Sequence, residues 1–143
     1  MEYAEAVWGV SQPAHAEMDP DADDPIIAAL TCSLVEESGE ISFEPRSRLA
    51  TIYGMTVTIE QYHCRYGLNP RYADRLNSGP LSIAARDGAG DVRAIELEGH
   101  PFFIATLFQP ERSALAGQKH PLIRAFVAAV CDRVAVSQRK SVV

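Results

Sequence analysis

The stretch Gly99-His100-Pro101-Phe102-Phe103-Ile104-Ala105-Thr106-Leu107-Phe108-Gln109-Pro110-Glu111 decides the fold of this chain. Residues 102–108 form an almost continuous apolar run of high β propensity, which stops at Gln109-Pro110-Glu111. A run that does not alternate is typical of a strand covered on both faces, so we predict a sheet with helices above and below it. Because ligands of open α/β sheets bind at the carboxyl ends of strands, we expect Gln109 and Glu111 to lie at the edge of a ligand crevice.

Composition bounds the class of protein. The 143 residues suit one domain, and the 47% hydrophobic content is enough for a core. Thirteen basic and nineteen acidic residues give a net charge of −6, which disfavours nonspecific nucleic-acid binding. No apolar run approaches the roughly 20 residues that cross a bilayer, and the acidic N-terminus is not a secretory signal. We therefore expect a cytoplasmic protein with neither a nucleic acid nor a membrane as its partner.

Neither the cysteines nor the acidic residues form a metal-binding pattern. Cys32, Cys64 and Cys131 are odd in number and have no CxxC spacing, so they predict neither a disulfide framework nor a zinc site. Residues 19–24 contain four aspartates but lack the glycine and the terminal glutamate of an EF-hand loop. We interpret this segment as a solvated acidic loop and expect no metal and no cofactor.

Local patterns predict the other elements. Helices are expected at the following ranges: 1–9, 25–30, 71–76 and 122–136. Strands are expected at these ranges: 31–35, 41–43, 49–53, 81–85 and 92–97, the last two forming a hairpin. Residues 112–119 are predicted to be a polar loop. Leu122, Phe126, Val130 and Val134 recur every four residues, so we expect this face of the last helix to pack on the sheet.

The apolar run and its polar end resemble the end of a class I glutamine amidotransferase domain, in particular the C-terminal domain of the CTP synthase family, where a His-Pro-Phe-Phe strand runs into Phe-His-Pro-Glu. Further matches stand in the same order along most of the chain: Tyr3-Ala4, Gly9, Asp19-Pro20, Pro25-Ile26, Arg65-Tyr66, Leu68-Asn69-Pro70, Ile95-Glu96-Leu97 and His120-Pro121-Leu122. Tyr62-His63-Cys64 and Tyr66-Gly67 look more like bacterial proteins related to the CTP synthase C-terminal region, some of which are selenoproteins. The resemblance implies an α/β, three-layer, flavodoxin-like fold, with residues 1–143 as its C-terminal portion in an N-terminally truncated domain.

The same resemblance implies the site. The family uses a Cys nucleophile, a His base and a Glu that orients the His; here Gln109 stands at the His position, while Glu111 remains. Glutamine has no titrating nitrogen and cannot accept a thiol proton. Arg65 and Tyr66 match the pair that holds the α-carboxylate and backbone of bound glutamine, and a guanidinium suits a carboxylate. The residues alone favour a surface arginine paired with a nearby glutamate at Arg65, and the resemblance makes the ligand-binding role an equal alternative.

Several functions remain open at this stage. The turn that bears the nucleophile is expected upstream of Met1, either because a selenocysteine codon was misread as a stop or because the chain is a fragment. The chain is then a pseudo-amidotransferase or a truncated selenoprotein homologue. Alternatively, it hydrolyses glutamine or γ-glutamyl amides when the nucleophile segment or a partner is present. The expected partners are glutamine or a similar small molecule, a synthase, or further copies of the chain, since half of a sheet would expose apolar surface.

Overall fold

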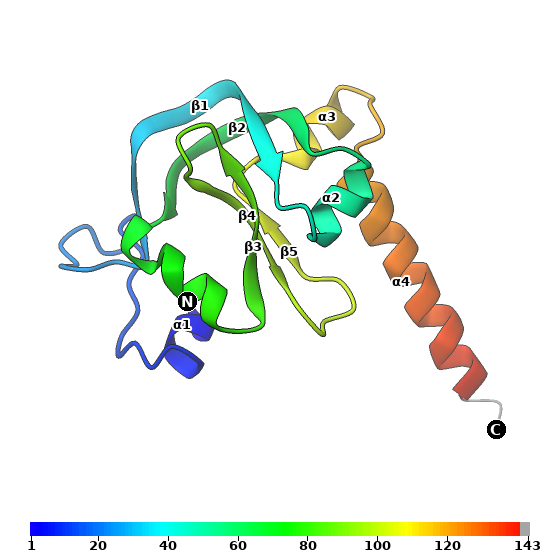
Figure 1. The fold of residues 1–143 in the computed structure, drawn as a ribbon, viewed down its shortest axis with the longest axis horizontal. Coiled ribbons are helices and arrows are strands. Elements are labelled where there is room, and N and C mark those ends of the chain that lie inside the picture. The colour runs from blue at the N-terminus through cyan, green and yellow to red at the C-terminus, as the bar shows by residue number, and fades with distance from the viewer. Residues whose placement is uncertain (141–143) are drawn as a thin grey trace.

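The computed structural model describes residues 1–140, without the side chains of Cys32, Ser33, Asn77 and residues 136–140. It contains one five-stranded sheet with helices at its ends and edges (Figure 1). The strands are β1 (Ile27–Phe43), β2 (Val57–Leu68), β3 (Leu81–Asp87), β4 (Val92–Leu97) and β5 (Ile104–Thr106). Their order is β2-β1-β3-β4-β5, and every pairing between neighbours is antiparallel.

Short helices connect the strands, and one long helix ends the described chain. They are α1 (Glu2–Ala6), α2 (Arg48–Tyr53), the 3₁₀ helix η1 (Pro70–Ser78), α3 (Pro110–Leu115) and α4 (Pro121–Lys140). Asn69 caps η1 by accepting a hydrogen bond from the N–H of Arg71, and Pro70 suits the first turn because it has no N–H to satisfy.

The α/β class is confirmed, but the 102–108 run is not a strand covered on both faces. Only Ile104–Thr106 pair with β4, and β5 is the last strand of the sheet, with Ala105 exposed. The sheet is antiparallel within the described residues. The helices that the sequence predicted on both faces of the 102–108 strand are therefore not found around β5. Phe102, just before the strand, packs against the core, and Phe108, just after it, is buried in the core.

Three local predictions were wrong for identifiable reasons. Residues 49–53 form helix α2, because the Ser47 hydroxyl caps the N–H of Ala50 at 2.9 Å and Gly54 ends the helix at φ +67°. The helix expected at 25–30 is the beginning of β1, whose Ile27 pairs with Leu68. Residues 112–115 of the loop expected at 112–119 belong to helix α3. The hairpin is confirmed as β3 and β4.

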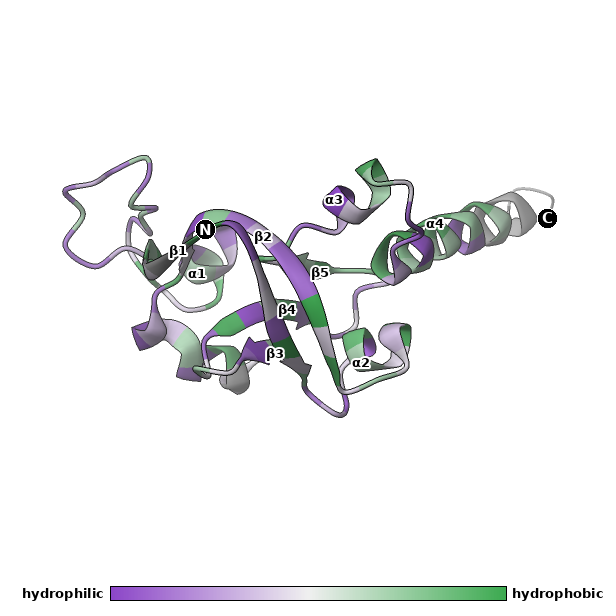
Figure 2. Ribbon diagram, turned by 90° about the horizontal axis from the view of Figure 1, so that it is seen from above, coloured by the Kyte–Doolittle hydropathy of each residue, from purple (hydrophilic) through white to green (hydrophobic). Residues whose placement is uncertain are grey.

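The sheet curls until its two edges approach each other, as Figure 2 shows from above. The chain leaves β5 with the N–H of Leu107 bonded to the carbonyl of Arg93, then crosses to β2, where the N–H of Gln109 donates to the carbonyl of Gln61 at 2.9 Å. The core fills the inside of this curl. It consists of Ile41, Phe43, Leu49, Tyr62, Ala84, Ala85, Ala94, Phe108 and Leu122.

A second apolar group holds α1 against η1. The ring of Trp8 stacks on that of Tyr72, with centroids 6.1 Å apart and planes at 7°, and Tyr3 meets Trp8 edge-on at 5.6 Å. Ala4 and Ile26 are buried beside them. This cluster places the N-terminal helix over one end of the sheet.

Helix α4 departs from its expected packing. Leu122 is buried, but Phe126, Val130 and Val134 are each about half exposed, and the helix runs away from the sheet in both ribbon views (Figures 1 and 2). Among the described side chains, its first turns contact the body, against α2 and α3 and through an edge-to-face contact between Phe102 and Phe126 with ring centroids 5.5 Å apart. The face predicted to lie on the sheet therefore extends past the edge of the sheet.

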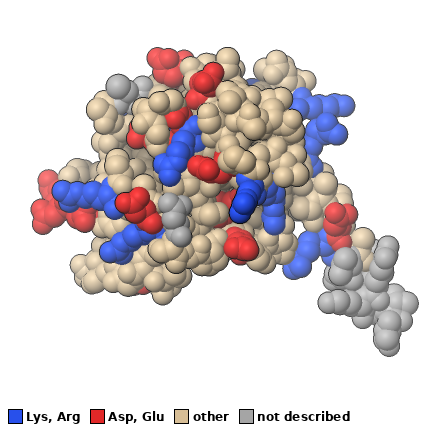
Figure 3. Space-filling model, viewed as in Figure 1, with Lys and Arg blue, Asp and Glu red and all other residues tan. Residues whose placement is uncertain are grey.

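Charges of both signs are interspersed over the face that Figure 3 shows. None of the described helices combines the length and the apolar character that a membrane-spanning helix needs.

Candidate functional site

The two residues matched to the family's catalytic positions lie beside the edge strand β2. Gln109 is half-buried and precedes α3, and its backbone is fixed by the hydrogen bond to Gln61. Phe108 anchors this turn, because it is 1% exposed and packs edge-on against Tyr62. Glu111 lies in the first turn of α3 with its side chain exposed. The turn is thus held by the core, while the two polar side chains stand at its surface.

Arg65 and Tyr66 lie further along β2. Arg65 is exposed on the same side of the strand as Gln61, four residues or about 13 Å away. Tyr66 is half-buried, and its ring meets that of His15 at 5.4 Å. No ion pair of Arg65 with a glutamate is found among the described side chains. The structure therefore places the predicted ligand-binding pair and the predicted catalytic positions along one strand, although not in mutual contact.

Between these two positions lies a charged cluster that the sequence did not indicate, formed by Glu36, His63 and Arg112. Nδ1 of His63 lies 2.7 Å from Oε1 of Glu36, and Nη1 of Arg112 donates to the same oxygen at 3.1 Å. The other guanidinium nitrogens of Arg112 reach Oε2 of Glu36 and Oε1 of Gln61. The cluster therefore joins β1, β2 and α3 next to Gln109.

The backbone at Glu36 is unusual and explains how the cluster forms. Glu36 adopts φ +56°, which is uncommon for a residue other than glycine, at an irregularity in the pairing of β1 with β2. Hydrogen bonds from Arg112 and then from His63 hold the pKa of the Glu36 carboxyl below its ordinary value. The spacing of Gln61, His63 and Arg65 on one side of β2 is the only sequence signal for this cluster. The bulge that turns Glu36 toward these residues leaves no pattern in the sequence.

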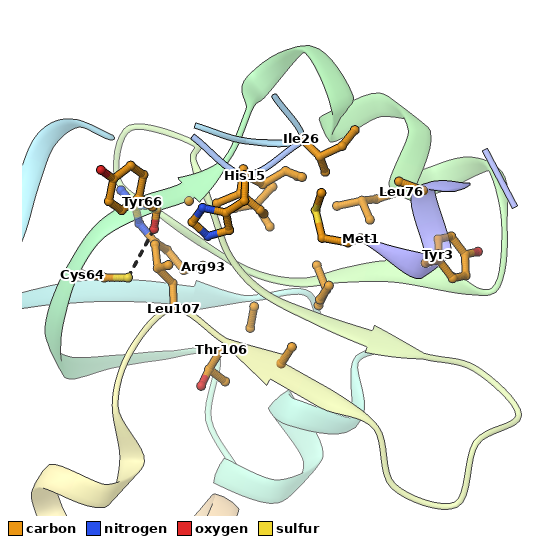
Figure 4. Close-up of a pocket in the computed structure, with 18 of the residues that line it drawn as sticks. Met1, Tyr3, His15, Ile26, Cys64, Tyr66, Leu76, Arg93, Thr106 and Leu107 are labelled. Atoms are coloured by element: carbon orange, nitrogen blue, oxygen red, sulfur yellow. Dashed lines mark hydrogen bonds between the residues drawn. The ribbon is translucent and has the colours of Figure 1, made fainter. Parts of the chain in front are cut away.

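A cavity of about 880 Å³ opens beside this strand. His63, Arg65 and Tyr66 line one end of it, and Thr106 and Leu107 of the β5 segment line the floor. Figure 4 shows Met1, Tyr3, Ile26 and Leu76 at the other end and His15 and Tyr66 nearer to Cys64, whose thiol is hydrogen-bonded to the carbonyl of Tyr66 at 3.2 Å. Most of the wall is apolar, so a ligand here would meet polar groups mainly at the β2 end.

A second polar group is buried on the other side of β2. Tyr53 donates to Oε1 of Glu60 at 2.6 Å, and Nε2 of His120 lies 3.1 Å from the same oxygen. Since Nδ1 of His120 accepts the N–H of Leu122, the neutral imidazole carries its proton on Nε2 and donates it to Glu60. Burial, and then the hydrogen bond to Glu60, raises the pKa of Tyr53. This group joins α2, β2 and the first turn of α4, away from the cavity.

In the part of the chain that the structure describes, no three His, Cys, Asp or Glu side chains gather closely enough to hold a metal ion.

Comparison with known proteins identifies the relationship. The CTP synthase of Bifidobacterium longum is 30% identical over an alignment of 151 positions, which covers 94% of this chain and 27% of that protein. The CTP synthase of Caldivirga maquilingensis is 34% identical over 143 residues, covering 93% of this chain and 26% of that protein. No protein-family model matches the chain. The chain is homologous to part of CTP synthase.

The fold shows which part of CTP synthase is related. The solved glutaminase domain of Trypanosoma brucei CTPS with bound acivicin superposes on 92% of this chain with a TM-score of 0.81, at 23% sequence identity. The chain covers 55% of that solved chain and about a quarter of the length of the CTP synthases it matches. It therefore has the fold of a portion of a class I glutamine amidotransferase domain. Its similarity to CTP synthase confirms the resemblance inferred from the Phe102–Glu111 motif.

Proposed function

We propose that this chain forms the glutamine-binding side of a class I amidotransferase site that lacks the hydrolytic base. The observation that carries the proposal is Gln109. It occupies the position of the family's histidine, in a turn fixed by the buried Phe108 and by the bond to Gln61. A carboxamide cannot accept a proton from a nucleophile, so Glu111 has no imidazole at this position to orient. Homology to CTP synthase supports the class of site, and Gln109 supports its loss of activity.

The ligand-binding half of the proposal rests on Arg65 and Tyr66. Arg65 carries an exposed guanidinium at the mouth of the cavity, where it can hold the α-carboxylate of glutamine in a bidentate pair. The neighbouring backbone and ring of Tyr66 border the same space. In this role the 143 residues act as one amidotransferase-like unit that binds glutamine or a similar amino acid, alone or beside a synthase partner.

One observation favours a second candidate, an active hydrolase of glutamine or γ-glutamyl amides. His63 lies two residues along β2 from Gln61, so an imidazole paired with a carboxylate does stand near position 109. In a longer gene product that supplies a cysteine, His63 could accept its proton. A selenocysteine in that place would need less help, because a selenol ionises more readily than a thiol. The in-frame genomic sequence before Met1 decides whether either nucleophile is encoded.

Calorimetric titration with L-glutamine tests the proposed function. We expect the wild-type chain to give a saturable heat and Arg65→Gln to weaken binding at least tenfold, because the charge-assisted bonds to the α-carboxylate are lost. Arg71→Gln is the matched control, since Arg71 is exposed on η1 and pairs only weakly with Asp24 at 3.5 Å. Featureless titrations with glutamine and related amino acids would contradict the proposal.

An ammonia assay separates the two candidates. If the site lacks only its base, a longer product that carries a nucleophile releases ammonia from glutamine after Gln109→His and not before. Ammonia release by that product with Gln109 unchanged would show that the active hydrolase is the correct alternative. The additional variant His63→Gln then tests whether His63 is the base.

A further inference from the structure

The open edge of β5 lies between two apolar surfaces that face in different directions. Phe103, Ala105, Thr106 and Leu107 line the cavity, and Phe103 is 41% exposed. On the other face of the strand, Phe102 packs against Phe126 of α4. Side chains on both sides of one edge strand are thus left partly uncovered.

The backbone of β5 still has groups available for pairing. The carbonyl of Phe103 and the N–H of Leu107 are bonded to β4. Hydrogen bonding alternates along an antiparallel strand, so the N–H and C=O groups of Ile104 and Thr106 point to the open edge. The three-residue strand contains no charge and no proline, the features that commonly protect a sheet edge.

Helix α4 extends past the sheet that it flanks. Its 20 residues span about 30 Å, and it projects beyond β5 (Figure 1). We name as the α4 stripe its exposed apolar residues, which are Phe126, Val127, Val130 and Val134, between 46% and 53% exposed. A helix in this position would cover further strands if the sheet continued past β5.

We propose that β5 is a docking edge, at which a polypeptide equivalent to the rest of a CTP synthase glutaminase domain adds a strand and is covered by the α4 stripe. The chain matches 55% of the solved glutaminase domain with a TM-score of 0.81, so 45% of that domain has no counterpart here. Elements of one domain pack around a common core. The edge of β5, the cavity wall and the α4 stripe are the apolar surfaces available for such packing. A sheet extended in this way has helices on its faces, as the apolar run first suggested.

The occupant we infer is this complementary polypeptide, not a second copy. A pair of β5 strands would share only three residues each. Such a short ladder would leave most of the α4 stripe, which extends away from the strand, without a partner.

The test mixes the 143-residue chain with a separate polypeptide, the part of the Caldivirga maquilingensis CTP synthase glutaminase domain that this chain does not match. Light scattering coupled to size exclusion is expected to show a one-to-one complex. Thr106→Pro removes an edge N–H, and Val130→Lys places a charge on the α4 stripe; each is expected to weaken the complex at least tenfold. Thr106→Val keeps the N–H, and Ala128→Lys places the same charge on the exposed opposite side of α4, so neither should weaken it.

Three outcomes would overturn the inference. These are the absence of a complex, a complex that all four variants leave intact, and a homodimer that Thr106→Pro dissociates but the added polypeptide does not displace. The last of these would assign the edge to a second copy. Glutamine binding by the chain alone is measured separately, so the proposed function can fail while the complex forms, or the reverse.

Discussion

Two tyrosines, the half-buried Tyr53 and the buried Tyr62, show how much depends on a single hydroxyl. Tyr53 donates to Glu60 in the group that also contains His120, whereas the hydroxyl of Tyr62 has no hydrogen-bond partner among the described atoms. Both rings pack in the same core. A hydrogen bond to a buried carboxylate stabilises the fold, while an unpaired buried hydroxyl costs the free energy of its lost hydration.

The tyrosine pair makes a matched test. We expect Tyr53→Phe to lower the free energy of unfolding by about 2 kcal/mol, because Glu60 loses a donor. Tyr62→Phe should leave it unchanged or raise it by up to about 1 kcal/mol. Urea denaturation of both variants at neutral pH measures the difference. Equal losses for the two would show that the hydrogen bond from Tyr53 to Glu60 adds no net stability.

Glu36 gives the candidate site a defined pH response. Its folded-state pKa is below the ordinary value of 4.5, so its ion pairs stabilise the fold above that pH and are lost as the pH falls through the depressed pKa. Arg112→Ala removes the larger cause, and we expect the pKa of Glu36 to rise toward 4.5. A carboxyl NMR titration of Glu36 in both proteins measures the change. An unaltered pKa would mean that Arg112 does not hold Glu36 in solution.

The hairpin of β3 and β4 carries an ion pair of its own, in which Arg93 is buried and Asp87 is partly exposed. Arg93 is 6% exposed, with Nε 3.0 Å from Oδ2 of Asp87, and it lies over the ring of Tyr62. The sequence predicted this hairpin well, because strand alternation and the Gly88–Gly90 turn are local signals. It did not reveal that Arg93 faces inward, since that depends on contacts with another strand.

Removing one partner of this pair should be costly. We expect Asp87→Ala to lower the free energy of unfolding by about 3 kcal/mol, because the Arg93 charge is left buried without its main partner. Asp91→Ala should cost under about 1 kcal/mol, because Asp91 is exposed and lies 3.3 Å from the same guanidinium. Thermal or urea unfolding compares the two. A loss of the same size for both aspartates would contradict the distinction between buried and exposed partners.

Most elements with strong local signals were predicted, whereas α2 was missed despite its local caps, and the contacts between distant segments were not predicted. The Asn69-Pro70 cap pointed to η1, and the four-residue repeat from Leu122 pointed to α4. Residues 49–53 have strand propensity, but the Ser47 cap and Gly54 make them a helix. The β1 bulge that brings Glu36 to His63 and Arg112 arises from the pairing of two long strands, which no single segment encodes.

At the scale of the whole molecule, the 99–111 stretch and the matches along the chain were enough to infer the relationship to CTP synthase. The arrangement of the sheet could not be inferred from them. The apolar run 102–108 indicated a strand covered on both faces, whereas β5 is an edge strand of an antiparallel sheet. The proposed docking at β5 would explain the discrepancy, because the residue types suit a strand with a neighbour on each side. Arg65 and Tyr66 lie on β2, and Gln109 and Glu111 lie beside that strand at the start of α3.

The packing of Trp8 between the edge-on ring of Tyr3 and the stacked ring of Tyr72 has a practical consequence. Trp8 is the only tryptophan in the chain, and it lines the cavity that also contains Arg65. Its indole emission and near-ultraviolet circular dichroism therefore come from one known place in the molecule. The protein carries its own optical reporter for that cavity, without any label.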